Sequence, residues 1–291
     1  MKICILYGGV SSERKISISS ANSIYEAILD DYSIEMYDFT GDYVELLSKV
    51  EHVDLVFNAL HGGDGENGVV QKFLEKNKIK FTGSNSLASK IAMNKIECKK
   101  ICVENNIPTP KWDIYRKEKI SLKLPYVVKP YDDGSSIGLS IVKDERHADD
   151  ALIECLKISK NIIFEEYIDG REVTVSILNG KALPVVEILP KGDFYNYKCK
   201  YTKGECDYKV PALLSLELST LLQDYSIKIH NLLNCGSYSR VDFRISHSSE
   251  VFFLEINTLP GFTKTSLFPK AASEVGFNYR ELINLIIKLS L

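Results

Sequence analysis

The chain has 291 residues, of which 45% are hydrophobic and 26% are charged, a balance typical of a globular protein with two or three small domains. The net charge of −3 provides no basic excess for nucleic acid, and no apolar run reaches the roughly 20 residues of a membrane span. The seven scattered cysteines, without a Cys-x-x-Cys pair, indicate reduced thiols and a cytoplasmic location rather than a disulfide framework.

Strand and helix patterns alternate through the first part of the chain, which predicts a parallel βαβ sheet. The elements expected there are strands at 2–7, 33–39, 53–60 and 79–82, and helices at 15–29, 43–50 and 67–77. Around Gly83 the pattern changes, and two helices are expected at 86–93 and 95–105.

From Lys111 onward the expected strands are shorter and have the character of antiparallel sheets. They are placed at 111–115, 126–130, 137–142, 161–167, 171–178, 181–189, 236–245 and 251–257, with helices at 146–157, 215–233 and 279–289. The polar segment from Pro190 to Pro211 is expected to be a long loop, and its aromatic residues favour docking over disorder.

The last two strands predict a metal site. Side chains in a strand alternate between two faces, so Arg240 and Asp242 share one face of the first strand, and Glu255 and Asn257 share one face of the second. A turn-like segment between them predicts a hairpin that brings these side chains together. Two carboxylates and an amide oxygen suit Mg²⁺. The alternative is an exposed sheet face with scattered charges, which the apolar residues on the opposite face disfavour.

Two other segments have the chemistry of a nucleotide site. Lys129 ends a strand and is followed by the glycine- and serine-rich stretch 132–138, whose backbone N–H groups can approach an anion closely. No P-loop motif occurs, and by itself the stretch could be an ordinary hairpin turn. The apolar run 162–168 ends in acids and can bond an adenine edge through its backbone and a ribose through an acid, although such a run is more often a core strand.

Taken together, these segments resemble the ATP-grasp superfamily and, within it, the D-alanine–D-alanine ligase family. The motifs that carry the resemblance run in order through nearly the whole chain: Gly8 to Glu13, His61-Gly62 with Glu66 to Gly68, Val128 to Pro130 with Gly134 to Gly138, Gly170 to Glu172, Lys200-Tyr201, Arg240 to Asp242, and Glu255 to Thr263. The last of these motifs is close to diagnostic of the family.

The resemblance implies an α/β fold with an N-terminal parallel-sheet βαβ domain, residues 1–86, followed by a two-part ATP-grasp fold with mixed and antiparallel sheets. The two parts are expected at 87–178 and 179–291, with a lid loop at 190–211. It also implies an ATP-dependent ligase that joins two D-alanines through a D-alanyl phosphate for peptidoglycan precursor synthesis. A homodimer without nucleic-acid or membrane partners is expected.

By the same resemblance, ATP lies between the two ATP-grasp parts. The residues implied in binding it are Lys95, Lys129, Ser135, Ser136 and Lys200 around the phosphates, Glu165, Glu166, Tyr167 and Ile168 around the adenine, and Glu172 at the ribose. Asp242 and Glu255 are implied to hold one Mg²⁺ ion, and Glu255 and Asn257 a second, with Mn²⁺ able to substitute.

The family pattern implies a separate set of residues for the amino acids. Its members are Glu13 at the ammonium of the first D-alanine, Ser266 at the carboxylate of the second, Arg240 and the Gly261 N–H at the oxyanion, His61 facing the substrates, and Tyr201 linked to Ser135 and Glu13. Structural roles are open for three of them: Glu13 suits the first turn of a helix, Ser266 suits a turn, and His61 suits a satisfied structural position. A tyrosine at 201 goes with amide rather than ester formation in this family.

The chain departs from the family pattern at Asn94, where an Asp is usual, at Glu66-Asn67, where an acid pair is usual, and at Gly63-Asp64. These departures bear on rate and affinity more than on reaction type. Residues 63–68 also match Gly-x-Gly-x-x-Gly, which would suit a nicotinamide-dependent oxidoreductase, although the acid required after the next strand is missing. The sequence is also compatible with an ATP-grasp ligase that joins a different D-residue or forms a depsipeptide, and with a non-catalytic binding protein on this fold.

Overall fold

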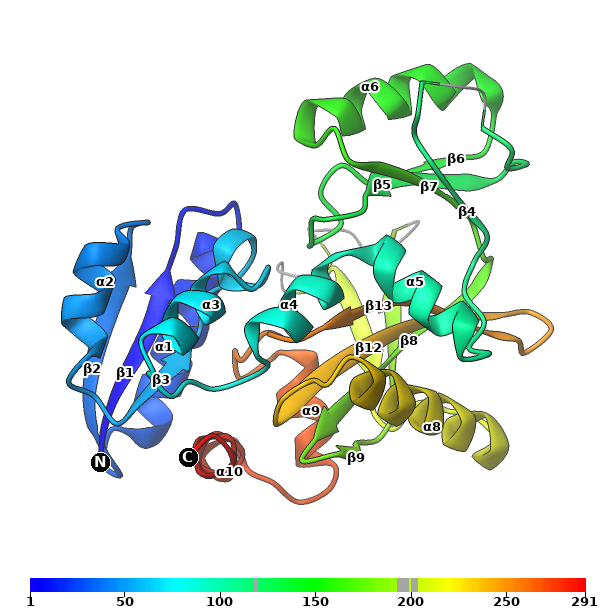
Figure 1. The fold of residues 1–291 in the computed structure, drawn as a ribbon. Helices are drawn as coiled ribbons and strands as arrows, with labels where there is room; N and C mark the ends of the chain where they lie inside the picture. The colour runs from blue at the N-terminus through cyan, green and yellow to red at the C-terminus, as the bar shows by residue number, and fades with distance from the viewer. Residues whose placement is uncertain (118–119, 193–198, 200–203) are drawn as a thin grey trace.

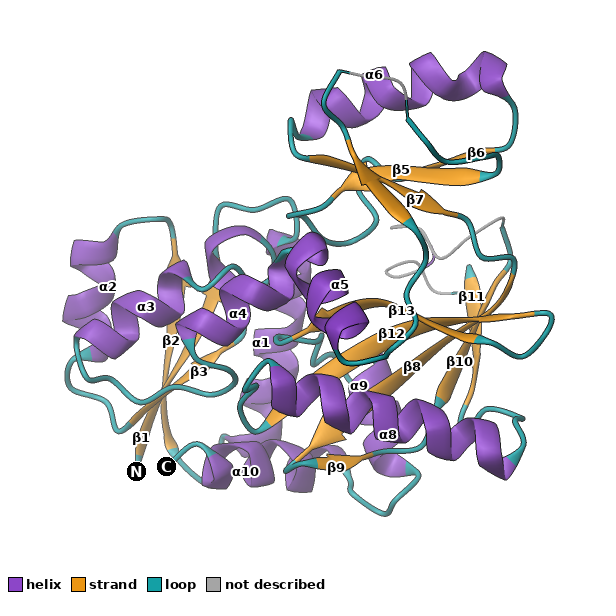
Figure 2. Ribbon diagram, turned by 45° about the vertical axis from the view of Figure 1, so that its right-hand side comes forward, coloured by secondary structure: helices purple, strands orange, loops and turns teal. Residues whose placement is uncertain are grey.

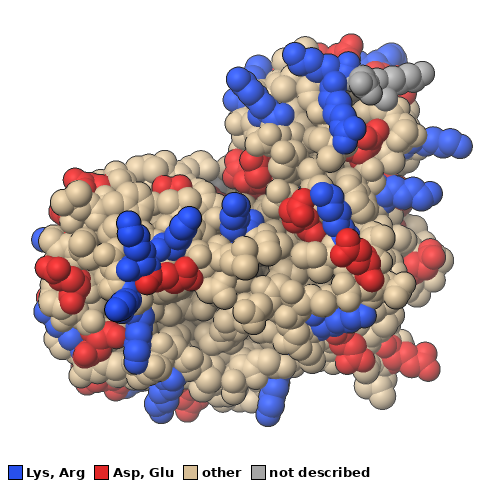
Figure 3. All heavy atoms as spheres, viewed as in Figure 1, with Lys and Arg blue, Asp and Glu red and all other residues tan. Residues whose placement is uncertain are grey.

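The computed structural model describes residues 1–117, 120–192, 199 and 204–291. Three sheets organise the chain, and Figure 1 shows them as three lobes, with the central lobe standing above the other two. The predicted α/β class, with a parallel sheet first and antiparallel sheets after it, is confirmed. Basic and acidic side chains are mixed over the face in Figure 3, in keeping with a net charge near zero.

The first lobe is a parallel sheet, as its βαβ pattern predicts, with three strands in the order β2-β1-β3. Its elements are β1 (Lys2–Gly8), α1 (Arg14–Ile28), β2 (Ser33–Phe39), α2 (Tyr43–Val50), β3 (Leu55–Asn58), the 3-10 helix η1 (Gly63–Gly65) and α3 (Val69–Lys76). The predicted strand at 79–82 is wrong: only Phe81 forms an isolated bridge, to Val56. Gly83, with a φ of 98°, turns the chain away directly after this bridge.

Two helices then lead into the central lobe, an antiparallel sheet in the order β4-β7-β5-β6 with α6 across one face (Figure 1). The elements are α4 (Ser86–Met93), α5 (Lys95–Glu104), β4 (Trp112–Ile114), β5 (Tyr126–Pro130), β6 (Ser140–Val142), η2 (Glu145–His147), α6 (Ala148–Ile158) and β7 (Ile162–Glu166). The strand predicted at 137–142 begins later, because Ser135, Ser136 and Gly138 adopt positive φ values and belong to a loop.

The third lobe is an antiparallel sheet in the order β11-β10-β8-β12-β13, and Figure 2 shows its strands side by side with α8 across one face. Its elements are β8 (Gly170–Leu178), β9 (Lys181–Ala182), β10 (Val186–Pro190), β11 (Cys206–Lys209), α8 (Leu216–Leu232), β12 (Tyr238–Ser246), β13 (Val251–Asn257), α9 (Leu267–Ser273) and α10 (Tyr279–Leu289). The strand predicted at 181–189 is divided into β9 and β10, with Pro184, which lacks an N–H, between them.

Two elements of this lobe were absent from the prediction. β11 lies inside the segment expected to be a loop and pairs antiparallel with β10 from Glu187↔Lys209 to Pro190↔Cys206. α9 follows the family motif near Gly261, and its Pro269 is tolerated because it lies in the first turn. Both are short and carry polar or proline residues, so neither has a strong periodic pattern.

The first and third lobes share one hydrophobic core. The Phe262 ring packs against Phe57 of β3 at a centroid distance of 6.0 Å and against Tyr238 of β12 at 5.2 Å. At the end of the chain α10 lies beside α1, so both termini are near the N-terminal sheet (Figure 1). Among the residues that the structure describes, none of the helices is long and apolar enough to cross a membrane.

Candidate active site

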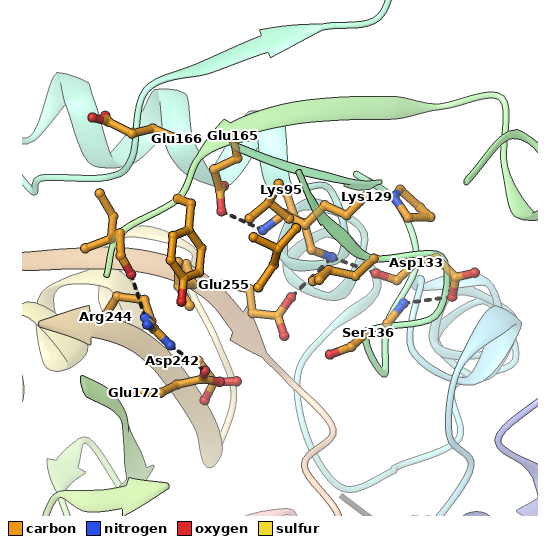
Figure 4. Close-up of a pocket in the computed structure, with 18 of the residues that line it drawn as sticks. Lys95, Lys129, Asp133, Ser136, Glu165, Glu166, Glu172, Asp242, Arg244 and Glu255 are labelled. Atoms are coloured by element: carbon orange, nitrogen blue, oxygen red, sulfur yellow. Dashed lines mark hydrogen bonds and ion pairs between the residues drawn. The ribbon is translucent and has the colours of Figure 1, made fainter. Parts of the chain in front are cut away.

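A cavity lies between the central sheet and the C-terminal sheet (Figure 4). Most residues expected around ATP and metal line it: Lys95, Lys129, Ser136, Glu165, Glu166, Tyr167, Ile168, Glu172, Asp242 and Glu255. They come from α5, β5, β7, β8, β12 and β13 and from the loops that follow β5 and β7, so segments distant in sequence meet here. Lys200 and Tyr201, predicted for the same region, lie outside the described residues.

Lys95 begins α5 and lies at the edge of the cavity next to a carboxylate. Its Nζ atom is 3.2 Å from Oε2 of Glu255 and donates a hydrogen bond of 2.6 Å to the carbonyl of Asp133. Burial alone lowers the pKa of Lys95, but Glu255 raises it, and the net pKa lies above the ordinary value. Lys95 is therefore a buried, charged lysine that faces the cavity, as a phosphate ligand must be.

Glu165 of β7 lies between two lysines. Its Oε1 accepts from Lys129 at 2.8 Å, and its Oε2 is 2.6 Å from Nζ of Lys99. Burial raises the pKa of Glu165, but the two lysines lower it, and the net pKa lies below the ordinary value. The side chain thus fixes Lys129 at the wall of the cavity. Lys99 was missed from the sequence, although it follows Lys95 by four residues and so shares its helix face.

The departure at Asn94 has a structural explanation. Its side chain accepts hydrogen bonds from the backbone N–H groups of Ile96 and Glu97 at 3.0 and 3.2 Å, and so caps the N-terminus of α5. Asn and Asp are about equally good at this task. The helix that presents Lys95 is therefore capped in the same manner as it would be with an aspartate.

The hairpin prediction is confirmed, because β12 and β13 pair antiparallel with Arg240 opposite Asn257 and Asp242 opposite Glu255. The Asp242 carboxylate accepts from Arg240 at 2.9 and 2.8 Å, from Asn257 at 3.1 Å and from Thr174 at 2.5 Å. Cationic side chains already lie on both carboxylates, Arg240 on Asp242 and Lys95 on Glu255.

This donor set fits a magnesium ion. Two carboxylates and an amide on paired strands are hard oxygen donors, and they lie beside the lysines of the nucleotide cavity. Within the described part of the chain, no three side chains of the His, Cys, Asp and Glu types are grouped to hold a metal. A metal here would therefore draw on Asn257 in addition to Asp242 and Glu255.

A second cavity adjoins the first, and Gly134 lines both. The described residues expected to act on amino acids all line it: Glu13, His61, Ser135, Arg240, Gly261 and Ser266. Tyr208 and Thr265 line it too and were missed. Tyr208 was missed because β11, which carries it, was not expected to be a strand. The glycine loop therefore lies between the two cavities.

Glu13, the residue that precedes α1, lines this second cavity. It is only 5% exposed, accepts a hydrogen bond from the hydroxyl of Ser135, and lies so close to Gly62 that a Cβ there would be 2.7 Å from its Oε2. His61 is held between Ser20 and Glu66, each at 3.3 Å. A buried carboxylate facing a polar cavity is suited to bind an ammonium group.

Ser266 and Gly261 also line this cavity. The Ser266 hydroxyl oxygen is 2.7 Å from the hydroxyl of Thr263 and accepts from the Thr263 backbone N–H at 3.1 Å. A Cβ at Gly261 would be 3.0 Å from this oxygen, so the glycine keeps space beside it. Ser266 also precedes α9, whose N-terminus favours a negative charge.

Two family models match this chain. Residues 87–288 match the family model described as D-ala D-ala ligase C-terminus, and residues 41–84 match the one described as D-ala D-ala ligase N-terminus. The chain belongs to the D-alanine–D-alanine ligase family. It is thereby an ATP-dependent ligase, and the oxidoreductase and binding-protein interpretations are wrong.

Relatives in this family match over the full length. The D-alanine–D-alanine ligase of Aquifex aeolicus (strain VF5) is 42% identical over 294 residues, covering 99% of this chain and 100% of the relative. That of Carboxydothermus hydrogenoformans (strain ATCC BAA-161 / DSM 6008 / Z-2901) is 39% identical over 308 residues, covering 100% of this chain and 98% of the relative.

Solved structures of the family are similar as well. The D-alanine–D-alanine ligase from Bacillus anthracis complexed with ATP has a TM-score of 0.88 and 34% identity, covering 100% of this chain and 96% of that one. The VanG D-Ala:D-Ser ligase from Enterococcus faecalis has a TM-score of 0.85 and 27% identity, covering 100% and 99% of the two chains. The family fold therefore accommodates more than one second substrate.

Proposed function

We propose that the two adjoining cavities join two D-alanines at the expense of ATP, with ATP in the cavity between the sheets and the amino acids in the cavity around Glu13. The observation that carries this proposal is the shared wall at Gly134. It places a cavity of lysines and carboxylates next to a cavity that contains an acid for an ammonium group and Arg240 for an oxyanion.

In the first step, a carboxylate oxygen of one D-alanine attacks the γ-phosphorus of ATP, and ADP leaves. Lys95 and Lys129 bind phosphate oxygens and neutralise charge as the phosphoryl group moves. The loop with Ser135 and Ser136 covers the phosphates with backbone N–H groups. When bound, Mg²⁺ held by Asp242, Glu255 and Asn257 would supply further positive charge beside the phosphates.

In the second step, the amine of another D-alanine attacks the carbonyl carbon of the D-alanyl phosphate. Phosphate leaves with one oxygen of the original carboxylate, and the protons of the ammonium group pass to phosphate and solvent. Arg240 and the Gly261 N–H stabilise the oxyanion, Glu13 binds the first ammonium group, and Ser266 binds the second carboxylate. His61, next to Glu66 and Ser20, orients the substrates.

Several narrower points belong to this proposal. Glu165 to Ile168 line the adenine, and Glu172 binds the ribose. Lys200 at the phosphates and Tyr201 beside Ser135 follow from the family pattern alone. So do a homodimer, two magnesium ions with Mn²⁺ as a substitute, and the domain boundaries after residues 86 and 178.

The seven free cysteines support a reducing, cytoplasmic location for peptidoglycan precursor synthesis.

The test is a substrate screen with product analysis. Purified protein with ATP, Mg²⁺ and D-alanine should release phosphate and form D-alanyl-D-alanine, detected by mass spectrometry, whereas L-alanine should give no product. D-serine and D-lactate in place of the second D-alanine separate this function from that of ligases with other second substrates. Folded, nucleotide-binding protein that makes no D-alanyl dipeptide would contradict the proposal.

A further inference from the structure

Arg244 holds the segment that joins the two walls of the nucleotide cavity. β7 ends at Glu166 in the central sheet, and β8 begins at Gly170 in the C-terminal sheet, so residues 167–169 cross from one wall to the other. Arg244 is on β12, on the same face as Arg240 and Asp242, and it lines the cavity. The mechanism proposed above gives it no role.

The guanidinium of Arg244 contacts this segment at several points. Its Nε donates to the carbonyl of Ile168 at 3.0 Å, and one terminal nitrogen donates to the carbonyl of Gly170 at 3.1 Å. Its carbon atom Cζ lies 5.5 Å from the ring centroid of Tyr167, in cation–π contact. Figure 4 shows the side chain reaching from the C-terminal sheet toward the crossing segment.

The other terminal nitrogen reaches the residue proposed to bind ribose. It lies 3.2 Å from Oε2 of Glu172, and the two side chains are only 11% and 15% exposed. Arg244 and Glu172 occupy paired positions of β12 and β8, so the sheet itself sets their spacing. An ion pair with little exposure is screened weakly by salt and restricts the orientation of both side chains.

Gly170, at the end of the crossing segment, packs closely against the backbone of β12. Gly170 has a φ of 140°, and a Cβ there would be 2.0 Å from the carbonyl oxygen of Ile245. The start of β8 is therefore pressed against β12, next to Arg244. Arg244 fixes the segment further, because its planar guanidinium bonds two carbonyls and one carboxylate at the same time. A lysine cannot reproduce this geometry.

We propose that Arg244 is a positioning residue for the nucleotide: it fixes the backbone of 167–170 for the adenine and the carboxylate of Glu172 for the ribose as one unit. The proposal rests on the proposed function, since it takes ATP as the ligand of this cavity. Without the guanidinium, Glu172 loses the ion pair that sets the orientation of its carboxylate toward the ribose, so the protein loses its preference for a nucleotide that has both ribose hydroxyls.

The experiment compares the dissociation constants of ATP and 2′-deoxy-ATP for the full-length parent, Arg244→Met, Arg244→Lys, Glu172→Gln and the double variant Arg244→Met/Glu172→Gln. Arg171→Met is the matched control. Arg171 is the neighbouring arginine on β8, bonds Glu187 at 2.7 Å and the carbonyl of Leu213 at 3.0 Å, and does not line the cavity. Thermal unfolding of every variant reports folding separately from nucleotide preference.

We expect the parent and Arg171→Met to prefer ATP over 2′-deoxy-ATP by about tenfold, as for one hydrogen bond to a charged group. In Arg244→Met this preference should fall close to one, ATP affinity should drop about tenfold, and adding Glu172→Gln should change the preference no further. Arg244→Lys should lose most of the preference because it keeps the charge but not the fork.

An unchanged preference in folded Arg244→Met, or in Arg244→Lys if the methionine variant does not fold, would overturn the proposal and leave Arg244 only a structural role. A parent protein without any preference would overturn it as well. Neither result bears on dipeptide synthesis by the parent, which tests the proposed function by itself.

Discussion

The Nζ atom of Lys99 lies 2.6 Å from Oε2 of Glu165, and both side chains are almost completely buried. Lys99 also donates to the hydroxyl of Thr109 at 2.6 Å and lies 5.6 Å from the ring centroid of Trp112. Because the other oxygen of Glu165 accepts from Lys129, one carboxylate positions two cations. Burial lowers the pKa of Lys99 and Glu165 raises it, with a net lowering that reflects how little water reaches this site.

Replacing Lys99 by Met should destabilise the protein. The methionine fills a similar volume but leaves the Glu165 carboxylate with less compensation, and removing one partner of a buried pair costs about 3–5 kcal/mol. The free energy of unfolding in urea measures this loss. Lys100→Met is the control, because Lys100 pairs with Glu97 at the surface, where ion pairs contribute about 0–1 kcal/mol. Equal losses in the two variants would contradict the structural role of Lys99.

His230 should make stability depend on pH. Burial lowers the pKa of His230 below 6.5, and its Nδ1 lies 2.8 Å from the hydroxyl of Ser239. Below pH 6.5 the unfolded chain therefore binds more protons at this residue than the folded chain does. The contribution of neutral His230 to the free energy of unfolding is complete above pH 6.5 and is lost as the pH falls. The urea midpoint between pH 7.5 and 5.5 should fall less in His230→Asn than in the parent. His247→Asn, at an exposed site, should behave as the parent does.

Glu255→Gln should impair metal binding more than Asn257→Ala does. Glu255 is the residue expected to contact both metal ions, and the loss of a shared carboxylate should cost several kcal/mol of transition-state stabilisation. The direct readout is Mn²⁺ binding in the presence of ADP, followed by electron paramagnetic resonance, with dipeptide formation as a second readout. If Glu255→Gln binds Mn²⁺ with nearly the affinity of the parent, Glu255 is not a metal ligand and the proposed metal site is wrong.

Gly62→Ala should weaken the binding of D-alanine. Its Cβ would come within 2.7 Å of Oε2 of Glu13 and displace the carboxylate proposed to hold the ammonium group. A displacement of about 1 Å can cost on the order of 100-fold in rate. We therefore expect kcat/KM for D-alanine to fall by about 10- to 100-fold. Gly180→Ala is the control: Gly180 has a φ of 70°, close to the 66° of Gly62, but no atom lies within 4 Å of its added Cβ. Equal activity losses would assign the effect to backbone strain alone.

The alternating patterns of β12 and β13 were sufficient to predict a hairpin that brings Asp242, Glu255 and Asn257 together. They did not predict the shift in register after Asp242, which places Phe243 opposite Phe253. The βαβ order of the first lobe was equally clear, apart from the bridge at Phe81. These features depend on local periodicity, which a single sequence contains.

Other parts of the site depend on contacts between distant segments. Lys99, Glu165 and Thr109 come from a helix, a strand and a loop, and Arg244 meets the 167–170 segment only after β8 and β12 have paired. β11 forms because its backbone pairs with the free edge of β10, which lies earlier in the chain. Motif resemblance identified the cavity residues that the family shares, but the buried lysine and arginine that support them required the folded structure.

The most direct measurement of the central claim follows an oxygen atom. D-alanine labelled with oxygen-18 in its carboxylate is incubated with the protein, ATP and Mg²⁺, and the released phosphate is analysed by mass spectrometry. If the carboxylate attacks the γ-phosphorus and the second amine then displaces phosphate, each phosphate released with a dipeptide carries one labelled oxygen. Dipeptide accompanied by unlabelled phosphate would contradict the D-alanyl phosphate route.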